Sequence, residues 1–64
     1  MNNIGIKIGS RFKDKKNGDK ATVMDIRPFY LRGVSTPFME VKFDIEDDNR
    51  WIIVNRFDDF YELI

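Results

Sequence analysis

Apolar and polar residues alternate along several short stretches of the chain, as they do in β-strands that bury one face. In the clearest stretch the inward positions are Met39, Val41, Phe43 and Ile45. The outward positions of the same stretch are Glu40, Lys42 and Asp44. The pattern therefore predicts a strand over residues 39–45 with one face in the core.

The amino-terminal part predicts a strand and a tight turn. Four apolar residues share one parity, namely Ile4, Ile6, Ile8 and Phe12. Gly5 and Gly9 indicate that this strand bends or begins late, near Ile8. Asn17-Gly18 is a strong hairpin signal because both residues tolerate positive φ, so a second strand is expected from about Lys20.

The second strand changes parity midway. Ala21 and Val23 point to one side, whereas Met24 and Ile26 point to the other. A bulge near Met24-Asp25 would restore Val23 and Ile26 to the same face. Pro28 cannot donate to a sheet ladder, so residues 27–37 are expected to form an edge or a longer irregular loop.

The carboxy-terminal third predicts two more strands around a helical turn. Residues 46–49 (EDDN) form a turn by composition, and residues 50–54 (RWIIV) form a strand that is apolar on both faces. In NRFDDF, polar residues surround Phe57 and Phe60, which is consistent with a single helical or 3₁₀ turn that places both rings on the core. Residues 61–64 (YELI) form a short last strand.

Together these elements predict an all-β fold, a small five-stranded barrel with a 3₁₀ or single helical turn before the last strand. The stretches GSRFKDKKNGDKATVMDI, MEVKFDI, RWIIV and NRFDDF resemble those of SH3-like barrels, and residues 1–64 are expected to form one such domain. The resemblance is to small proteins encoded by temperate phages and other mobile elements. The peptide-binding motif of signalling SH3 domains and the Gly-centred signature of ribosomal barrels are absent, so the fold implies no activity.

Composition excludes several kinds of chemistry. The 64 residues include neither Cys nor His, which removes disulfides, ordinary zinc sites, thiol nucleophiles and the usual general base. No nucleophile has an evident base, so we expect no enzyme and no cofactor. The sequence shows neither a signal-peptide pattern nor an apolar run of membrane-spanning length, so we expect a soluble cytoplasmic protein.

Charge is balanced overall and uneven along the chain. Residues 1–33 carry eight Lys or Arg and three Asp. Residues 34–64 carry three Lys or Arg and eight Asp or Glu. One half is therefore basic and the other acidic, although the strands of a small barrel mix the two halves in space.

The stretch RPFYLRG is the first candidate binding surface. Arg27 and Arg32 flank Phe29 and Tyr30, and such a set can stack on bases or aromatic side chains and pair with phosphates or carboxylates. The alternative is that Phe29 or Leu31 closes one end of a barrel that is short of core. We expect one ring of the Phe29-Tyr30 pair to be buried and the other exposed.

Trp51 raises a second pair of alternatives. If residues 27–37 fold over its face, Trp51 packs against Phe29 or Tyr30. If they do not, Trp51 and Phe38 form a surface for a partner or for a homodimer.

Two charged clusters complete the candidates. Possible phosphate contacts are Lys13, Lys15, Lys16 and Lys20, although the interpretation as a solvated turn is favoured because the chain has no basic excess. The acidic cluster comprises Asp44, Glu46, Asp47 and Asp48. Its spacing lacks the Gly and the closing carboxylate of a calcium loop, where Asn55 stands instead, so no metal is expected and the cluster is interpreted as an acidic rim of the binding surface.

These observations lead to two functional hypotheses. The first is a non-enzymatic protein-interaction module, which the family resemblance would make a modulator or inhibitor of host machinery that handles nucleic acid. The second is direct nucleic-acid binding, with the lysines on phosphates and Phe29 or Tyr30 stacked on bases. Self-association through an edge strand is a further alternative, because Pro28 protects only one edge.

Overall fold

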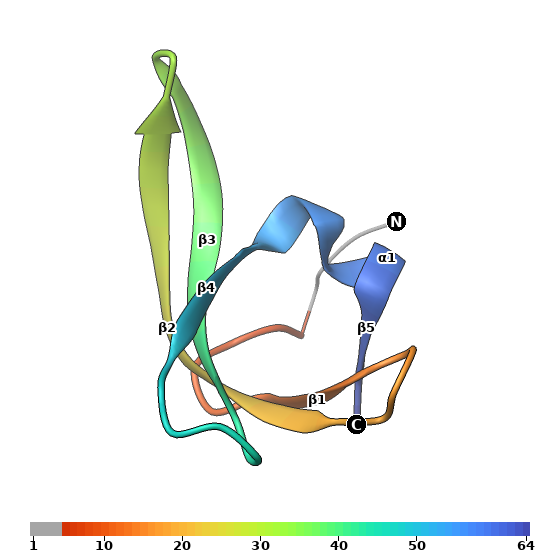
Figure 1. Cartoon of the computed structure of the whole chain (residues 1–64). Coiled ribbons are helices and arrows are strands. Elements are labelled where there is room, and N and C mark those ends of the chain that lie inside the picture. Colours follow the sequence, from red (N-terminus) through yellow and green to blue (C-terminus); the bar gives the residue numbers. More distant parts are fainter. Residues whose placement is uncertain (1–4) are drawn as a thin grey trace.

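The computed structural model describes residues 5–64, which form five strands and one helical turn in two parts (Figure 1). In chain order the elements are β1 (Arg11–Asp14), β2 (Lys20–Leu31), β3 (Val34–Phe43), β4 (Arg50–Ile53), the 3₁₀ turn η1 (Val54–Arg56), α1 (Phe57–Phe60) and β5 (Tyr61–Leu63). The predicted mostly-β fold and the helical turn before the last strand are therefore confirmed.

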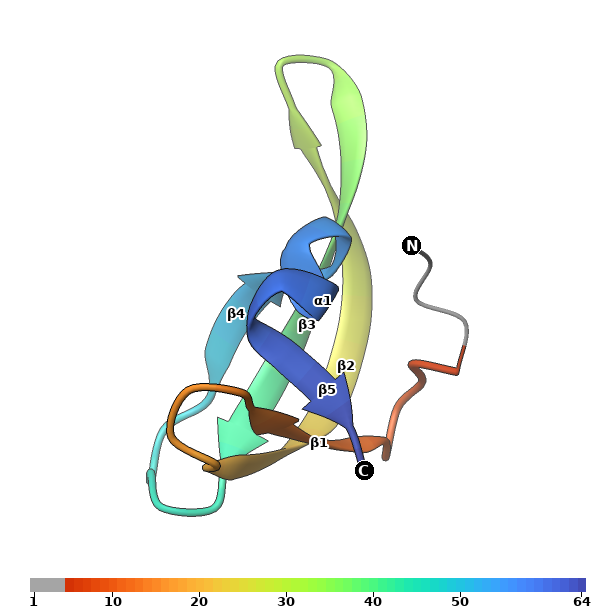
Figure 2. The same cartoon turned by 90° about the vertical axis from the view of Figure 1, so that its right-hand side faces the viewer.

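All five strands belong to one antiparallel sheet in the order β4-β3-β2-β1-β5. The sheet curls, so that the helical turn and β5 return across the face that carries the core (Figures 1 and 2). Among the described residues β4 pairs only with β3 and β5 only with β1, so both remain edge strands. The pairing therefore shows a curled sheet and does not show a closed barrel.

The core gathers on the concave face of this sheet. Its buried apolar residues are Phe12, Ala21, Val23, Met39, Val41, Phe43 and Phe57. The ring of Phe12 is at the centre, with centroids 5.2 Å from Phe57 and 5.3 Å from Tyr61, both edge to face. Such aromatic pairs add to the stabilisation from burial alone, which matters in a domain this small.

The bulge in β2 was predicted correctly. The register with β3 shifts between Val23 and Asp25, and beyond the shift Ile26 pairs with Met39 on the core side. Before the bulge, β2 pairs with β1 on one side and β3 on the other. A bulge bends and twists its strand, and β2 accordingly turns away from β1 and continues with β3 alone (Figure 1).

The prediction of an irregular loop over residues 27–37 was wrong. Strands β2 and β3 stay paired as far as Leu31 and Val34, joined by the two residues Arg32 and Gly33. Both have positive φ, 54° and 79°, as a type I′ turn requires. The physical reason for the error is that Pro28 faces Pro37 across the ladder, at a position where neither proline is needed as a donor.

Three apolar residues lie elsewhere than predicted. Ile8 is exposed and precedes β1, because the chain turns at Gly9, whose φ is +94°. Ile45 is exposed because β3 ends at Phe43 and the turn begins. Phe57 is buried as predicted, but Phe60 is 54% exposed, because it is the last residue of α1 and stands where the chain passes into the edge strand β5. Ile4, which was predicted to share the inward face, lies outside the described residues.

Candidate functional site

The β2–β3 hairpin extends beyond the rest of the sheet as a two-stranded arm, defined here as residues 27–37. Neighbouring strands reach only its base, because β1 pairs with residues 20–22 of β2 and β4 with residues 38–41 of β3. The tip stands clear of the rest of the molecule in both views (Figures 1 and 2). The tip of the arm therefore presents both faces to the surroundings, whereas Thr36 nearer the base is buried.

The outer face of the arm base, opposite the core, carries an aromatic cluster of Phe29, Phe38 and Trp51. The ring of Phe29 lies 5.2 Å from that of Phe38 and 5.2 Å from that of Trp51, centroid to centroid. Of the two alternatives left open for Trp51, the contact with Phe29 is observed, and Phe38 belongs to the same cluster. The cluster is nevertheless open to solvent, since Phe29 remains 38% and Trp51 41% exposed.

The rest of the predicted aromatic and basic set divides between the two faces and the tip. Tyr30 has the opposite parity to Phe29 and is 76% exposed, so neither ring of the pair is buried, contrary to the expectation. Arg27 lies on the outer face, where its Nε donates to Asp25 Oδ2 at 2.6 Å. This bond keeps the pKa of the Asp25 carboxyl below its ordinary value.

Arg32 occupies the tip in a backbone conformation that its side chain does not favour. It is the one non-glycine residue of the described chain with a positive φ. Asn, Asp or Gly would fit this turn position with less strain. Beside it, Leu31 and Val34 form a cross-strand pair of exposed apolar side chains, which the sequence analysis did not single out as site residues.

The two prolines of the arm block its edges. Leu31 and Val34 flank a two-residue turn and so form a hydrogen-bonded pair, and pairs of this kind alternate with non-bonded ones. Pro28 and Pro37 face each other three pairs further along, at a non-bonded position where a backbone N–H would point outward. Each edge of the arm therefore lacks one of its outward donors, which discourages pairing with another strand. Pro37 protects the second edge, which the sequence analysis left open.

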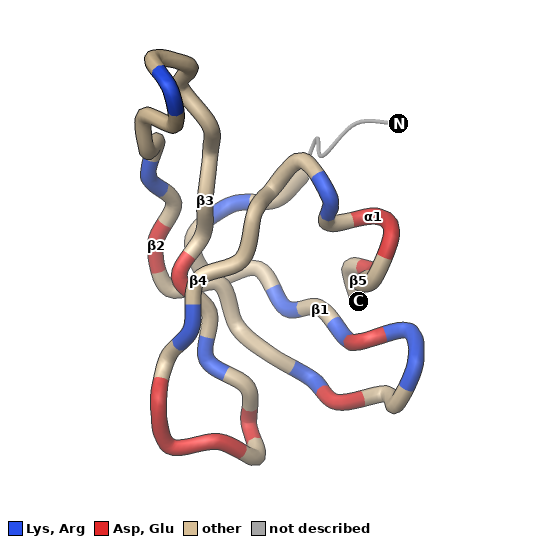
Figure 3. Tube along the Cα trace, turned by 45° about the horizontal axis from the view of Figure 1, so that its top comes forward, with Lys and Arg blue, Asp and Glu red and all other residues tan. Residues whose placement is uncertain are grey.

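The lysine cluster lies away from the arm, around the β1–β2 connection. Lys13 Nζ is 3.3 Å from Glu62 Oε2, and Lys15 Nζ donates to the carbonyl of Asp58. Lys16 and Lys20 are exposed. The blue positions of this connection and those of the arm lie at different ends of the chain trace (Figure 3), so they do not form one continuous surface.

The acidic cluster is at the end of the molecule opposite the arm tip (Figure 3). Asp44 accepts two hydrogen bonds from Arg11, which lower the pKa of its carboxyl, and Glu46 pairs with Arg50. Asp47 and Asp48 form no ion pair within residues 5–64. The structure therefore does not bring this cluster to the rim of the arm.

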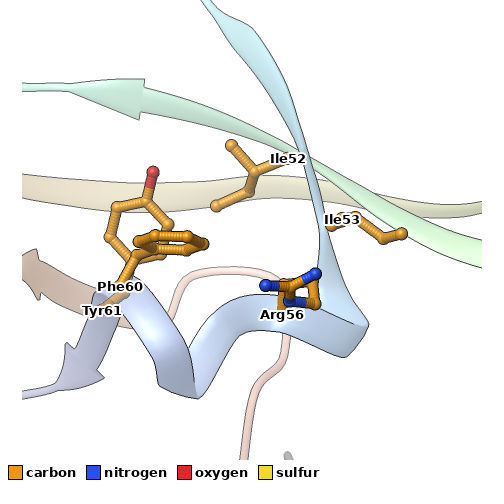
Figure 4. Close-up of a pocket in the computed structure, with 5 residues that line it drawn as sticks. All are labelled: Ile52, Ile53, Arg56, Phe60 and Tyr61. Atoms are coloured by element: carbon orange, nitrogen blue, oxygen red, sulfur yellow. The ribbon is translucent and has the colours of Figure 1, made fainter.

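A pocket of about 320 Å³ opens between the two edge strands of the sheet. It is lined by Ile52, Ile53, Arg56, Phe60 and Tyr61 (Figure 4). Ile52 points toward the rings of Phe60 and Tyr61, and burial raises the pKa of the Tyr61 hydroxyl. The size is at the lower end for ligand pockets. Alternation along the chain does not predict this site, because its residues meet only through the curl of the sheet.

Residues 5–64 contain no group of three or more acidic, His or Cys side chains placed to hold a metal ion. The same residues include no helix that is long and apolar enough to cross a membrane.

Comparisons with protein-family models, with curated proteins and with solved structures found no match to this chain. The choice of function therefore rests on the geometry of the arm, the pocket and the charged clusters.

Proposed function

We propose that this protein is a non-enzymatic interaction module that docks on a larger protein through the β2–β3 arm. The observation that carries the proposal is the projection of an apolar hairpin into solvent by a chain that has little apolar surface to spare. Tyr30, Leu31 and Val34 are all exposed at or near the tip, where they contribute nothing to the core. Leu31 and Val34 share one face of the tip and Tyr30 lies on the other, so both faces of the tip expose apolar side chains, and exposed apolar surface of this kind marks an interaction site.

The composition of the arm matches that of protein-binding hot spots. Tyr, Trp and Arg are enriched there, and the arm with its base supplies Tyr30, Trp51, Arg27 and Arg32. The positive φ of Arg32 points in the same direction, because backbone strain is retained mainly at positions that serve a function. The blocked edges favour docking through side chains over strand pairing along the arm.

The fold type and the kind of partner are inferred from the family resemblance. We infer an SH3-like barrel, which is supported by the five-strand order and by the helical turn that immediately precedes β5. The resemblance to mobile-element proteins would make the partner host machinery that handles nucleic acid and the protein its modulator or inhibitor. A cytoplasmic location accords with this role.

Direct nucleic-acid binding remains the second hypothesis, and the geometry gives it less support. It requires lysines on phosphates and a ring on bases, but the lysine cluster and the arm, which carries Tyr30, lie at different ends of the molecule (Figure 3). Two of the four lysines are also engaged by neighbouring groups. Binding of this kind would show steep weakening with added salt, whereas arm docking requires no such dependence.

The test is a quantitative pull-down from lysate with a double variant of the arm, Tyr30→Ala with Arg32→Glu. Both positions are exposed, so the fold is expected to persist and the captured partner to be lost. The matched control is Ile45→Ala with Lys16→Glu, which removes an equally exposed apolar side chain and reverses one charge away from the arm. Unchanged capture by the arm variant, folded by circular dichroism, would refute the proposal.

A salt titration against single- and double-stranded DNA and RNA distinguishes the second hypothesis. The arm hypothesis expects no binding at low salt. Salt-sensitive binding that is lost on Lys16→Glu and kept by Tyr30→Ala would move the function to the lysine cluster.

A further inference from the structure

We infer that the outer edge of β4 and the pocket beneath it form a binding site for an extended acidic segment of a partner protein, with one apolar side chain seated in the pocket. The inference goes beyond the proposed function, although both take a protein as the ligand. It concerns a different surface, on the edge of the sheet between β4 and the helical turn.

First, the outer edge of β4 carries backbone N–H groups that point away from the sheet. Phe38 belongs to a hydrogen-bonded pair with Arg27, so its N–H and C=O point toward β2. Ile53 and Trp51, which face Phe38 and Glu40, therefore direct their N–H groups away from β3. No proline interrupts this edge, in contrast to both edges of the arm. An unpaired edge of this kind is a template for an added strand.

The second step is the register of such a strand. A residue placed opposite Ile52 would point its side chain to the same face as Ile52, because cross-strand neighbours share a face. That face opens into the pocket, toward the rings of Phe60 and Tyr61 (Figure 4). Phe60 is left largely exposed by the fold itself, so an apolar side chain entering the pocket would cover it.

The third step is charge. The segment from Arg50 to Arg56 carries two arginines and no carboxylate. Glu46 accepts from Nε and Nη2 of Arg50, and Asp59 accepts from Nε of Arg56, so within residues 5–64 each guanidinium keeps N–H donors for a further carboxylate. A second copy of β4 laid along this edge would bring further arginines to it, whereas an acidic segment would complement them. Charge thus favours a foreign acidic segment as the occupant.

Geometry places the acidic positions two residues from the apolar one. Arg50 has the same parity as Ile52, so the side chain opposite Arg50 lies on the pocket face as well. Arg56 borders the other end of the pocket. The expected ligand is therefore an extended segment with Asp or Glu two residues before and after a residue such as Leu.

The probe is an acetylated and amidated heptapeptide with Leu in the middle, Glu at the second and sixth positions and Thr elsewhere. Because this sequence reads the same in both directions, it tests parallel and antiparallel addition together. Binding would be followed by the fluorescence of Trp51, which adjoins the edge, and by backbone amide shifts of β4. Replacing Leu by Ser, or both Glu by Lys, is expected to weaken binding about three- to tenfold or more.

Two changes, one in the peptide and one in the protein, test the backbone hydrogen bonds between the peptide and β4. N-methylation of the two Thr residues next to Leu removes the donors that would face Trp51 and Ile53, without any change in the protein. On the protein side, Ile53→Pro removes the outward N–H, and its φ of −79° suits proline. Ile53→Val is the matched control that keeps the donor. We expect binding to be lost with the methylated peptide and with Ile53→Pro, and kept with Ile53→Val.

The arm variant Tyr30→Ala with Arg32→Glu separates this inference from the proposed function. It is expected to bind the peptide as the unaltered protein does, even if it loses the partner in lysate. The inference is overturned if the unaltered protein does not bind the peptide at millimolar concentration, or if the N-methylated peptide binds equally well. It is also overturned if sedimentation shows a dimer that Ile53→Pro dissociates and the peptide does not disturb, since the edge would then serve a second copy.

Discussion

The two halves of the β2–β3 hairpin use similar residues for different purposes. In the lower half, Val23, Met39 and Val41 are buried between neighbouring strands and the helical turn. In the arm, Tyr30, Leu31 and Val34 have the same apolar character and lie in solvent. The two halves differ in how many strands lie beside them, because β1 and β4 pair only with the lower half. Hydrophobicity along a strand therefore does not reveal which part holds the fold together.

The largest expected effect tests the buried half of this comparison. Phe12→Ala removes a fully buried ring that contacts Phe43, Phe57 and Tyr61. The expected loss is about 3–5 kcal/mol, which is comparable with the total stability of so small a domain. Urea unfolding followed by circular dichroism would show a largely unfolded variant at 25 °C. A variant that unfolds like the parent would contradict the assignment of Phe12 to the centre of the core.

A smaller effect compares two adjacent residues of the arm. Phe29→Ala breaks the contacts with Phe38 and Trp51 and is expected to cost about 1–2 kcal/mol. Tyr30→Ala, one residue further and on the opposite face, is expected to change the free energy of unfolding by less than about 0.5 kcal/mol. Urea unfolding with Trp51 fluorescence measures both. Equal costs would mean that the two faces of the arm do not differ as described.

The arm tip gives an effect of the opposite sign. Arg32→Asn replaces a residue held at a φ of 54° by one that tolerates this conformation. We expect a gain of about 0.5–1 kcal/mol, visible as a higher midpoint of thermal unfolding. Arg32→Val, which introduces a β-branched residue at the same φ, is the matched change and should lower the midpoint. If Arg32→Asn also abolishes partner capture, Arg32 contributes to binding although it lowers the stability of the fold.

The smallest expected effect concerns acid stability. Arg11 holds the pKa of Asp44 below its ordinary value, so this pair stabilises the folded state above about pH 4 and the contribution is lost as the pH falls through the lowered pKa. Asp44→Asn should therefore flatten the acid limb of the stability curve. Asp47→Asn is the control, since that carboxylate forms no ion pair within residues 5–64. Equal flattening by both variants would remove Asp44 as a specific contributor.

Local patterns were sufficient for most of the fold. Alternation located Met39, Val41 and Phe43 in the core, and the change of parity after Val23 identified the bulge. Asn17-Gly18 marked the first connection, and β2 begins at Lys20 as predicted. The connection is not the tight turn that was expected, because it spans residues 15–19 and Gly18 but not Asn17 has a positive φ. These features depend on interactions within a strand or a turn, so a single sequence carries them.

The candidate site was predicted only in part. The stretch around Phe29 was recognised, and its contact with Trp51 was one of the two alternatives considered. Its form as a paired arm was not, because a proline is compatible with a strand or with a loop until its partner is known. The two strands stay paired through this region because Pro28 faces Pro37, and that pairing joins residues on separate strands.

The sequence by itself determined a small all-β domain, its bulge, the place of its first connection and most residues of its core, because short-range periodicity encodes which side chains point inward. The tertiary structure decided which apolar residues have neighbours. Whether Phe60 or Tyr30 is covered depends on where the curled sheet returns and where adjacent strands end. The arm exists because β1 and β4 do not extend along it, and the β4 edge is open because β5 does not pair with β4. Where each strand ends and which strand it pairs with are set by contacts between distant parts of the chain.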